Sequence, residues 1–171
     1  MRKKLKGHHM VAVLMGAFMV GTSGAASAAH SFWSPLTSEE TPPVTSSNEY
    51  LIDALRCTGA YCDNISIRNS KTWRQYGTSS WQGYFSEEGN NSRICGGNSF
   101  MTGIACSGAY CDNVAIQCTN IKFTTKGHCE WTPAFSEEAG YLYLPAGSYA
   151  AGLQCEGAYC DNMRVLACQA L

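Results

Sequence analysis

The segment Cys57-Thr-Gly-Ala-Tyr-Cys-Asp-Asn64 decides the fold, because the chain contains it three times in almost identical form. The other copies are Cys106-Ser-Gly-Ala-Tyr-Cys-Asp-Asn113 and Cys155-Glu-Gly-Ala-Tyr-Cys-Asp-Asn162. Successive copies begin 49 residues apart, from 57 to 106 and from 106 to 155. We call each copy an octet. A fixed period of this length indicates three structural repeats in one chain.

A second repeated motif precedes each octet and completes the repeating unit. It begins with tryptophan and ends in Ser-Glu-Glu, at Trp33–Glu40, Trp81–Glu88 and Trp131–Glu138. We therefore predict a single domain over 29–171 that consists of three units, at about 33–80, 81–130 and 131–171.

The residues after each octet alternate in polarity or size, as in Ile65-Ser-Ile67, Val114-Ala-Ile116 and Met163-Arg-Val165. Such alternation predicts a half-buried strand. No stretch shows helical periodicity, and 17 glycines supply turns at short intervals. We predict a disulfide-rich, all-β protein with threefold pseudosymmetry. Either a β-prism or a β-trefoil fits three such units, since a closed fold exposes few sheet edges.

Residues 1–28 have the order of a secretory signal peptide, with four basic residues between positions 2 and 6, an apolar run at 11–20 and small residues up to Ala29. The apolar run is too short to span a bilayer, and we expect secretion to the extracellular space or periplasm. Without this segment, eight basic residues face thirteen acidic ones, a net charge of about −5. That charge argues against nucleic acid and anionic membrane as partners, and no second apolar stretch predicts membrane insertion.

All ten cysteines follow the predicted signal peptide, at Cys57, Cys62, Cys95, Cys106, Cys111, Cys118, Cys129, Cys155, Cys160 and Cys168. An even number in an exported chain predicts disulfides, whereas a zinc site would need Cys-x-x-Cys knuckles. We expect the two cysteines of each octet to bond to each other, with pairing between units as the alternative. Among the rest, Cys118 and Cys129 bound a plausible hairpin, which favours that pair and leaves Cys95 for Cys168. No metal or other cofactor is predicted.

The residue types of the octet suit the recognition of a neutral polyol. An ionised aspartate accepts hydrogen bonds from neighbouring hydroxyls, exposed backbone N–H groups donate to them, and a tyrosine ring covers a C–H face. The alternative is that the Asp-Asn pair only caps the turn through bonds to its backbone.

The second octet and the strand after it, residues 106–116, resemble the Ser-Gly-x-Tyr-x-Asp loop of the jacalin-related lectins, above all their griffithsin-like members with three such loops. This resemblance implies a β-prism of three four-stranded sheets that binds glycans, in particular mannose-like sugars. It implies one sugar site in each unit, formed by a glycine, a tyrosine and a carboxylate: Gly59, Tyr61 and Asp63; Gly108, Tyr110 and Asp112; Gly157, Tyr159 and Asp161.

The second unit also resembles the vitelline membrane outer layer proteins, which have the same fold. In those proteins a tryptophan segment leads to a Cys-x-x-Gly strand and then to an Asp-rich loop that ends in cysteine. Trp81, the run at 95–100 and the run at 112–118 follow this order.

The remaining motifs have plainer interpretations. The paired carboxylates of the Ser-Glu-Glu segments could bind calcium or supply a general acid, but adjacent residues of a strand point to opposite faces and do not automatically converge. These segments are therefore predicted to be solvated turns. Trp33, Trp81 and Trp131 are predicted to be core residues. Bridged cysteines and the lack of a Ser-His-Asp set predict that the protein is not an enzyme. Two classes remain, namely a secreted lectin with three similar sites and a non-catalytic extracellular structural or accessory module of a coat or toxin.

Overall fold

A computed structural model describes residues 30–171, so the predicted signal peptide lies outside the described residues. The described part is all-β, as predicted, and its only helical segments are three short 3-10 turns. Its strands are β1 (Ser31–Trp33), β2 (Val44–Thr45), β3 (Tyr50–Thr58), β4 (Asn64–Lys71), β5 (Tyr76–Trp81), β6 (Ser92–Ile94), β7 (Ser99–Ser107), β8 (Asn113–Ile121), β9 (Lys126–Trp131), β10 (Tyr141–Tyr143), β11 (Ser148–Glu156) and β12 (Asn162–Ala170). The 3-10 turns are η1 (Ala60–Cys62), η2 (Ala109–Cys111) and η3 (Ala158–Cys160).

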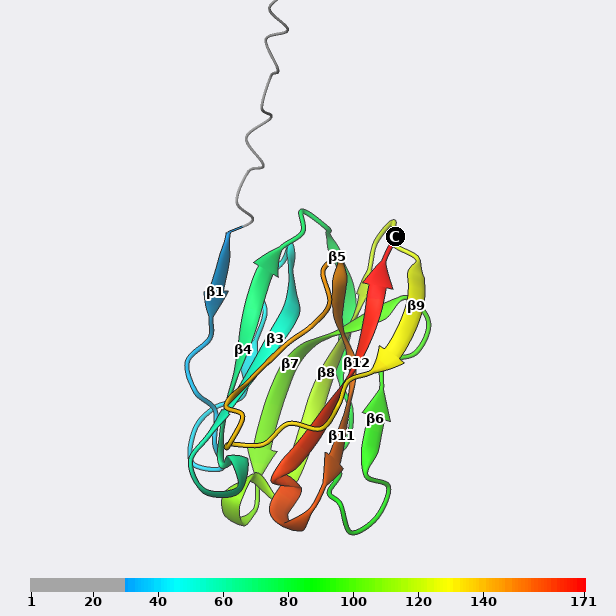
Figure 1. The fold of residues 1–171 in the computed structure, drawn as a ribbon. Coiled ribbons are helices and arrows are strands. Elements are labelled where there is room, and N and C mark those ends of the chain that lie inside the picture. Colours follow the sequence, from blue (N-terminus) through cyan, green and yellow to red (C-terminus); the bar gives the residue numbers. More distant parts are fainter. Residues whose placement is uncertain (1–29) are drawn as a thin grey trace, which may run out of the picture.

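The strands form three four-stranded antiparallel sheets, in the orders β1-β4-β3-β10, β2-β7-β8-β5 and β6-β11-β12-β9. Each sheet is centred on one long hairpin whose two strands are joined through an octet (Figure 1). The three hairpins share an irregularity in register at equivalent places, between Ile52 and Ala54, between Met101 and Gly103, and between Ala150 and Gly152. The sequence repeat is therefore also a structural repeat.

Each unit contributes one short strand to a neighbouring sheet. β2 pairs with β7, β6 pairs with β11, and β10 returns to pair with β3. This exchange links the three units in a ring. The longer outer strands β5 and β9 end at Trp81 and Trp131, so they cross the boundaries expected at 80/81 and 130/131.

The core lies between the three hairpins. The apolar residues predicted to alternate on the second strand of each hairpin are buried in one cluster, from Ile65 and Ile67 to Val114, Ile116, Met163 and Val165. A second cluster contains Leu51, Phe100 and Leu166, with Tyr149 packed against it. Burial of such side chains contributes about 1.5–3 kcal/mol each to folding.

The ten cysteines form five disulfides. Each octet closes on itself through Cys57–Cys62, Cys106–Cys111 or Cys155–Cys160, which confirms the local pairing. The prediction of Cys118–Cys129 and Cys95–Cys168 was wrong, because the remaining two disulfides are Cys95–Cys118 and Cys129–Cys168.

The physical reason is strand pairing. β8 and β9 do not form the expected hairpin, because β9 pairs with β12, where Cys129 lies directly opposite Cys168. Cys95 directly follows β6, which belongs to the sheet of β11, whereas Cys118 belongs to the sheet of β7. The bond Cys95–Cys118 therefore ties two sheets together.

Candidate functional site

The three octets form tight turns that lie together at one end of the molecule (Figure 1). Gly59, Gly108 and Gly157 have φ values of +83°, +76° and +72°, a region that favours glycine. In each octet the tyrosine and the following cysteine also have positive φ, and the aspartate N–H donates to the alanine carbonyl at 3.1 Å. The octet backbone is thus a repeated, closed turn held by its own disulfide.

The octet tyrosines meet in a single cluster, which we call the tyrosine triad. The ring centroids of Tyr61 and Tyr110 lie 5.4 Å apart, those of Tyr61 and Tyr159 5.3 Å, and those of Tyr110 and Tyr159 5.5 Å. Each side chain is 41–42% exposed. The sequence assigned these tyrosines to three separate sites, whereas the structure makes them one aromatic surface.

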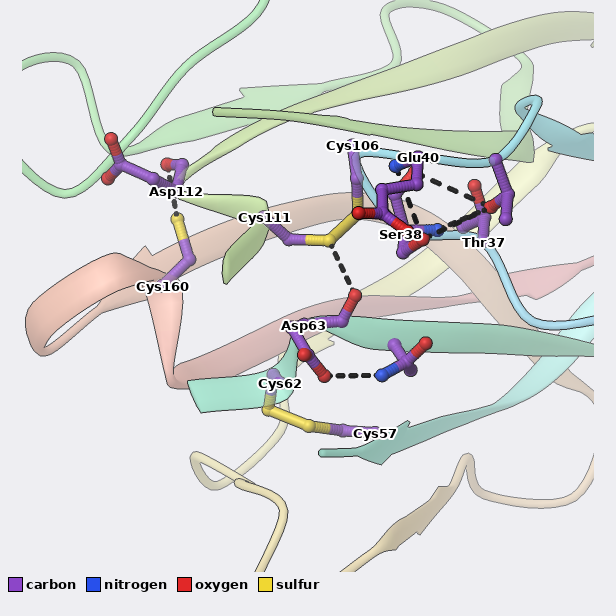
Figure 2. The surroundings of a disulfide bond; sticks show 12 residues. Thr37, Ser38, Glu40, Cys57, Cys62, Asp63, Cys106, Cys111, Asp112 and Cys160 are labelled. Carbon is purple, nitrogen blue, oxygen red and sulfur yellow. Dashed lines mark hydrogen bonds between the residues drawn. A yellow bond between two sulfur atoms is a disulfide. The ribbon is translucent and has the colours of Figure 1, made fainter. Parts of the chain in front are cut away.

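A ring of contacts also joins neighbouring octets. The sulfur of Cys111 lies 3.0 Å from the carbonyl oxygen of Asp63, as Figure 2 shows. Cys160 and Cys62 make the equivalent contacts at 3.2 Å with the carbonyls of Asp112 and Asp161. Because a bridged sulfur carries no proton, these are close sulfur–oxygen contacts rather than hydrogen bonds. They join the three octets in one cyclic arrangement.

The octet carboxylates are half-buried and turn toward their own loops. Asn64 donates through its side-chain amide to Asp63, Asn162 donates to Asp161 at 2.7 Å, and Asn113 donates to Asp112 at 3.3 Å. In the first and third octets a carboxylate oxygen also packs against the glycine of the turn. One oxygen of each aspartate is therefore engaged by the turn itself.

The Ser-Glu-Glu segments are turns, as predicted, but two of them also lie against an octet of another unit. Glu87 accepts a hydrogen bond from the backbone N–H of Tyr159 at 2.9 Å. The Glu137 carboxylate lies within 4.8 Å of the sulfurs of Cys57 and Cys62. Sequence reasoning missed both contacts between units, and the constant position of the motif ahead of each octet was the available signal.

Negative charge accumulates around the second octet. Partial burial, followed by the charges of Glu87 and Glu88, raises the pKa of the Asp112 carboxyl. Asp112 is thus less acidic than an isolated aspartate, and its neighbours make this end of the molecule unfavourable for anions.

The repeated tryptophans lie at the ends of the outer strands. Trp81 is 41% exposed and Trp33 packs edge-on against Tyr141, so the prediction of core tryptophans was wrong for these two. Trp131 is partly buried and packs against the second core cluster, so the prediction holds in part for this residue. The core has little room for Trp33 and Trp81, because Ile, Leu, Val and Met residues of the hairpins already fill it. A hollow of about 360 Å³ lies beside Trp81 and Tyr84, and another of about 350 Å³ lies beside Trp131; no octet residue lines either one.

These features define a disulfide-rich all-β protein with three four-stranded sheets. Five disulfides, with no unbridged cysteine among the described residues, are typical of an oxidising, extracellular setting. No helix within 30–171 has the length and hydrophobicity needed to cross a membrane. Comparison with protein-family models, curated proteins and solved structures finds no match. The likeness to jacalin-related lectins and to vitelline membrane outer layer proteins therefore stays a prediction.

Proposed function

We propose that this is a secreted, sugar-binding protein with a threefold β-prism fold, and that its octets form one composite site instead of three separate ones. The exchange of short strands around three four-stranded sheets supports the prism. The observation that carries the sugar-binding proposal is the tyrosine triad, because three partly exposed rings meet at the end of the molecule that also carries the three octet aspartates.

The chemistry of this end suits a polyol. The tyrosine faces cover the C–H face of a sugar ring, and their hydroxyl groups both donate and accept hydrogen bonds. Asp63 and Asp161 each use one oxygen to hold the turn, which leaves the second oxygen to accept a bond from a sugar hydroxyl. Asp112 is held in the same way by Asn113 and also has the Glu87 carboxyl beside it. Glu87 and Glu137 add negative charge beside the octets, so neutral or amino sugars are favoured over sulfated or sialylated ones.

The second candidate function is a non-catalytic extracellular accessory module. The bonds from Asn64, Asn113 and Asn162 to the neighbouring aspartates favour it, because they engage one oxygen of each carboxylate within its own turn. They join two side chains, whereas the turn-capping alternative expected bonds to the backbone.

A glycan array separates the two functions. The test protein carries Asp63→Asn, Asp112→Asn and Asp161→Asn, which preserve side-chain shape and remove three charges. The matched control is Glu130→Gln, an exposed carboxylate on β9 outside the octets. We expect the control to bind like the wild type and the triple variant to lose binding while its thermal unfolding stays cooperative. A wild-type protein that binds no glycan on neutral and amino-sugar arrays refutes the lectin and leaves the accessory module.

A further inference from the structure

The end of the molecule opposite the octets carries two exposed aromatic tips. They lie in the turn at 72–75 between β4 and β5 and in the turn at 122–125 between β8 and β9. β4 and β8 each start at an octet and run away from it for about 25 Å, so the tips and the octets lie at opposite ends (Figure 1).

The two tips form one continuous surface. The N–H of Lys122 donates to the carbonyl of Gln75 at 2.9 Å, and the Arg74 guanidinium donates to the hydroxyl of Thr124 at 2.7 Å. The same guanidinium donates to the carbonyl of Ala170 at 2.9 Å, which ties the last strand to the tips. These bonds hold the tips side by side in a defined geometry.

Trp73 and Phe123 project from the two tips. They are 71% and 97% exposed, the most exposed aromatic side chains among the described residues. Their φ values are +60° and +55°, in a region that bulky residues seldom adopt. Neither side chain belongs to a core cluster, so packing does not account for the unusual backbone. A strained turn that presents a large apolar side chain to solvent is typical of a binding surface.

The charge of this end differs from that of the octet end. Lys71, Arg74 and Lys122 lie at the tips, and the Lys71 ammonium sits 3.8 Å from the Trp73 ring centroid. Glu49 pairs with Lys71 at 3.4 Å, and the Arg74 guanidinium lies 3.3 Å from the main-chain oxygen of Leu171. The octet end carries three aspartates and the glutamates of the Ser-Glu-Glu segments. The exported chain is expected to be negative overall, but its charges are unevenly distributed, with basic residues at the tips and acidic residues at the octets.

We propose that this end is an interfacial membrane-docking surface, in which Trp73 and Phe123 enter the headgroup region of an anionic lipid bilayer. Aromatic side chains favour that region, and adjacent Lys and Arg residues are attracted to acidic lipids. The acidic octet end is repelled by the same lipids, so the protein docks with its octets facing away from the membrane. This replaces the expectation that anionic membranes are excluded as partners, since that expectation used only the net charge. The chain lies on the bilayer and does not span it.

Vesicle flotation tests the docking directly. The folded, oxidised protein is mixed with vesicles of phosphatidylcholine, alone or with an equal share of phosphatidylglycerol. The test variant is Trp73→Asn with Phe123→Asn, because asparagine tolerates positive φ and leaves the turns intact. The matched control is Tyr84→Asn, which removes a 50%-exposed aromatic side chain outside the tips. Each tip should contribute about tenfold to the affinity for anionic vesicles.

We expect the wild type and the Tyr84→Asn control to float with anionic vesicles, and the double variant to bind at least about a hundredfold more weakly. Brominated lipids should quench tryptophan fluorescence in the wild type and quench it much less in Trp73→Asn. The proposal is overturned if the wild type stays in solution or if the double variant binds the vesicles equally well. It is also overturned if added salt releases all vesicle-bound protein and brominated lipid quenches no tryptophan fluorescence. Self-association that the double variant abolishes, without vesicle binding, overturns it in favour of a second copy as partner. Glycan binding is scored separately and does not affect this result.

Discussion

The tyrosine triad makes a quantitative prediction, because three rings in mutual contact cannot lose their contacts independently. Tyr61, Tyr110 and Tyr159 form three pairs with centroids 5.3–5.5 Å apart. Edge-to-face pairs of this kind contribute about 0.5–1 kcal/mol each beyond the area that they bury. This value lies in the lower part of the range known for aromatic pairs, because the three side chains are about two-fifths exposed.

The order of removal sets the expected loss. The first replacement, for example Tyr61→Ala, breaks two pairs and should remove about 1–2 kcal/mol of pair energy from the free energy of unfolding. Adding Tyr110→Ala breaks the last pair, for a further loss of about 0.5–1 kcal/mol. Adding Tyr159→Ala then breaks no pair. Any backbone effect of alanine at positive φ recurs at each site and cancels in a double-mutant cycle.

Denaturant unfolding under non-reducing conditions measures these free energies. A cycle between Tyr61→Ala and Tyr110→Ala should give a coupling of about 0.5–1 kcal/mol, whereas a cycle between Tyr61→Ala and Tyr84→Ala should be additive. Equal losses at all three steps of the series would refute the reasoning, since they would mean that the rings do not stabilise one another.

Three further changes test the fold. Replacing Cys129 and Cys168 by alanine should cost about 4 kcal/mol of unfolding free energy, against about 2 for an octet bridge, because they are 39 residues apart and octet cysteines only 5; equal losses in denaturant unfolding would contradict this. Gly59→Ala should cost at least about 1 kcal/mol, since its Cβ meets the Asp63 carboxylate at positive φ; an unchanged melting temperature would disprove the clash. Burial raises the pKa of Tyr76, so the folded state keeps a proton that the unfolded chain releases, and stability should fall as the pH rises above about 10. Tyr76→Phe should reduce that fall, and an identical pH dependence in both proteins would exclude Tyr76 as its source.

Much of the fold could be predicted, because its strongest signals are local. The octet cysteines are separated by five residues, so the turn between them brings them together whatever the surrounding sheet does. The alternation after each octet predicted β4, β8 and β12 for the same reason. The long bridges could not be predicted, because Cys129 meets Cys168 only when β9 joins β12, a pairing between distant segments.

For the candidate site, too, local features could be predicted from the sequence and contacts between units could not. The octet motif located the residues, and its glycine marked the turn that needs positive φ. No pattern in the chain indicated that the tyrosines touch or that the turns at 72–75 and 122–125 are hydrogen-bonded neighbours. The constant position of Ser-Glu-Glu ahead of each octet was a signal, but it did not specify that Glu87 reaches Tyr159. Each of these contacts joins different units.

The sequence by itself determined the threefold repeat and the all-β class, and it favoured self-closed octets, because these features depend on the order of residues along each unit. The tertiary structure alone decided which strand each unit lends to its neighbour, how the long disulfides connect, and that three octets form one surface with two aromatic tips at the other end. The physical reason is that repetition specifies the unit, whereas the contacts between units depend on how the three hairpins pack their apolar faces around a shared core.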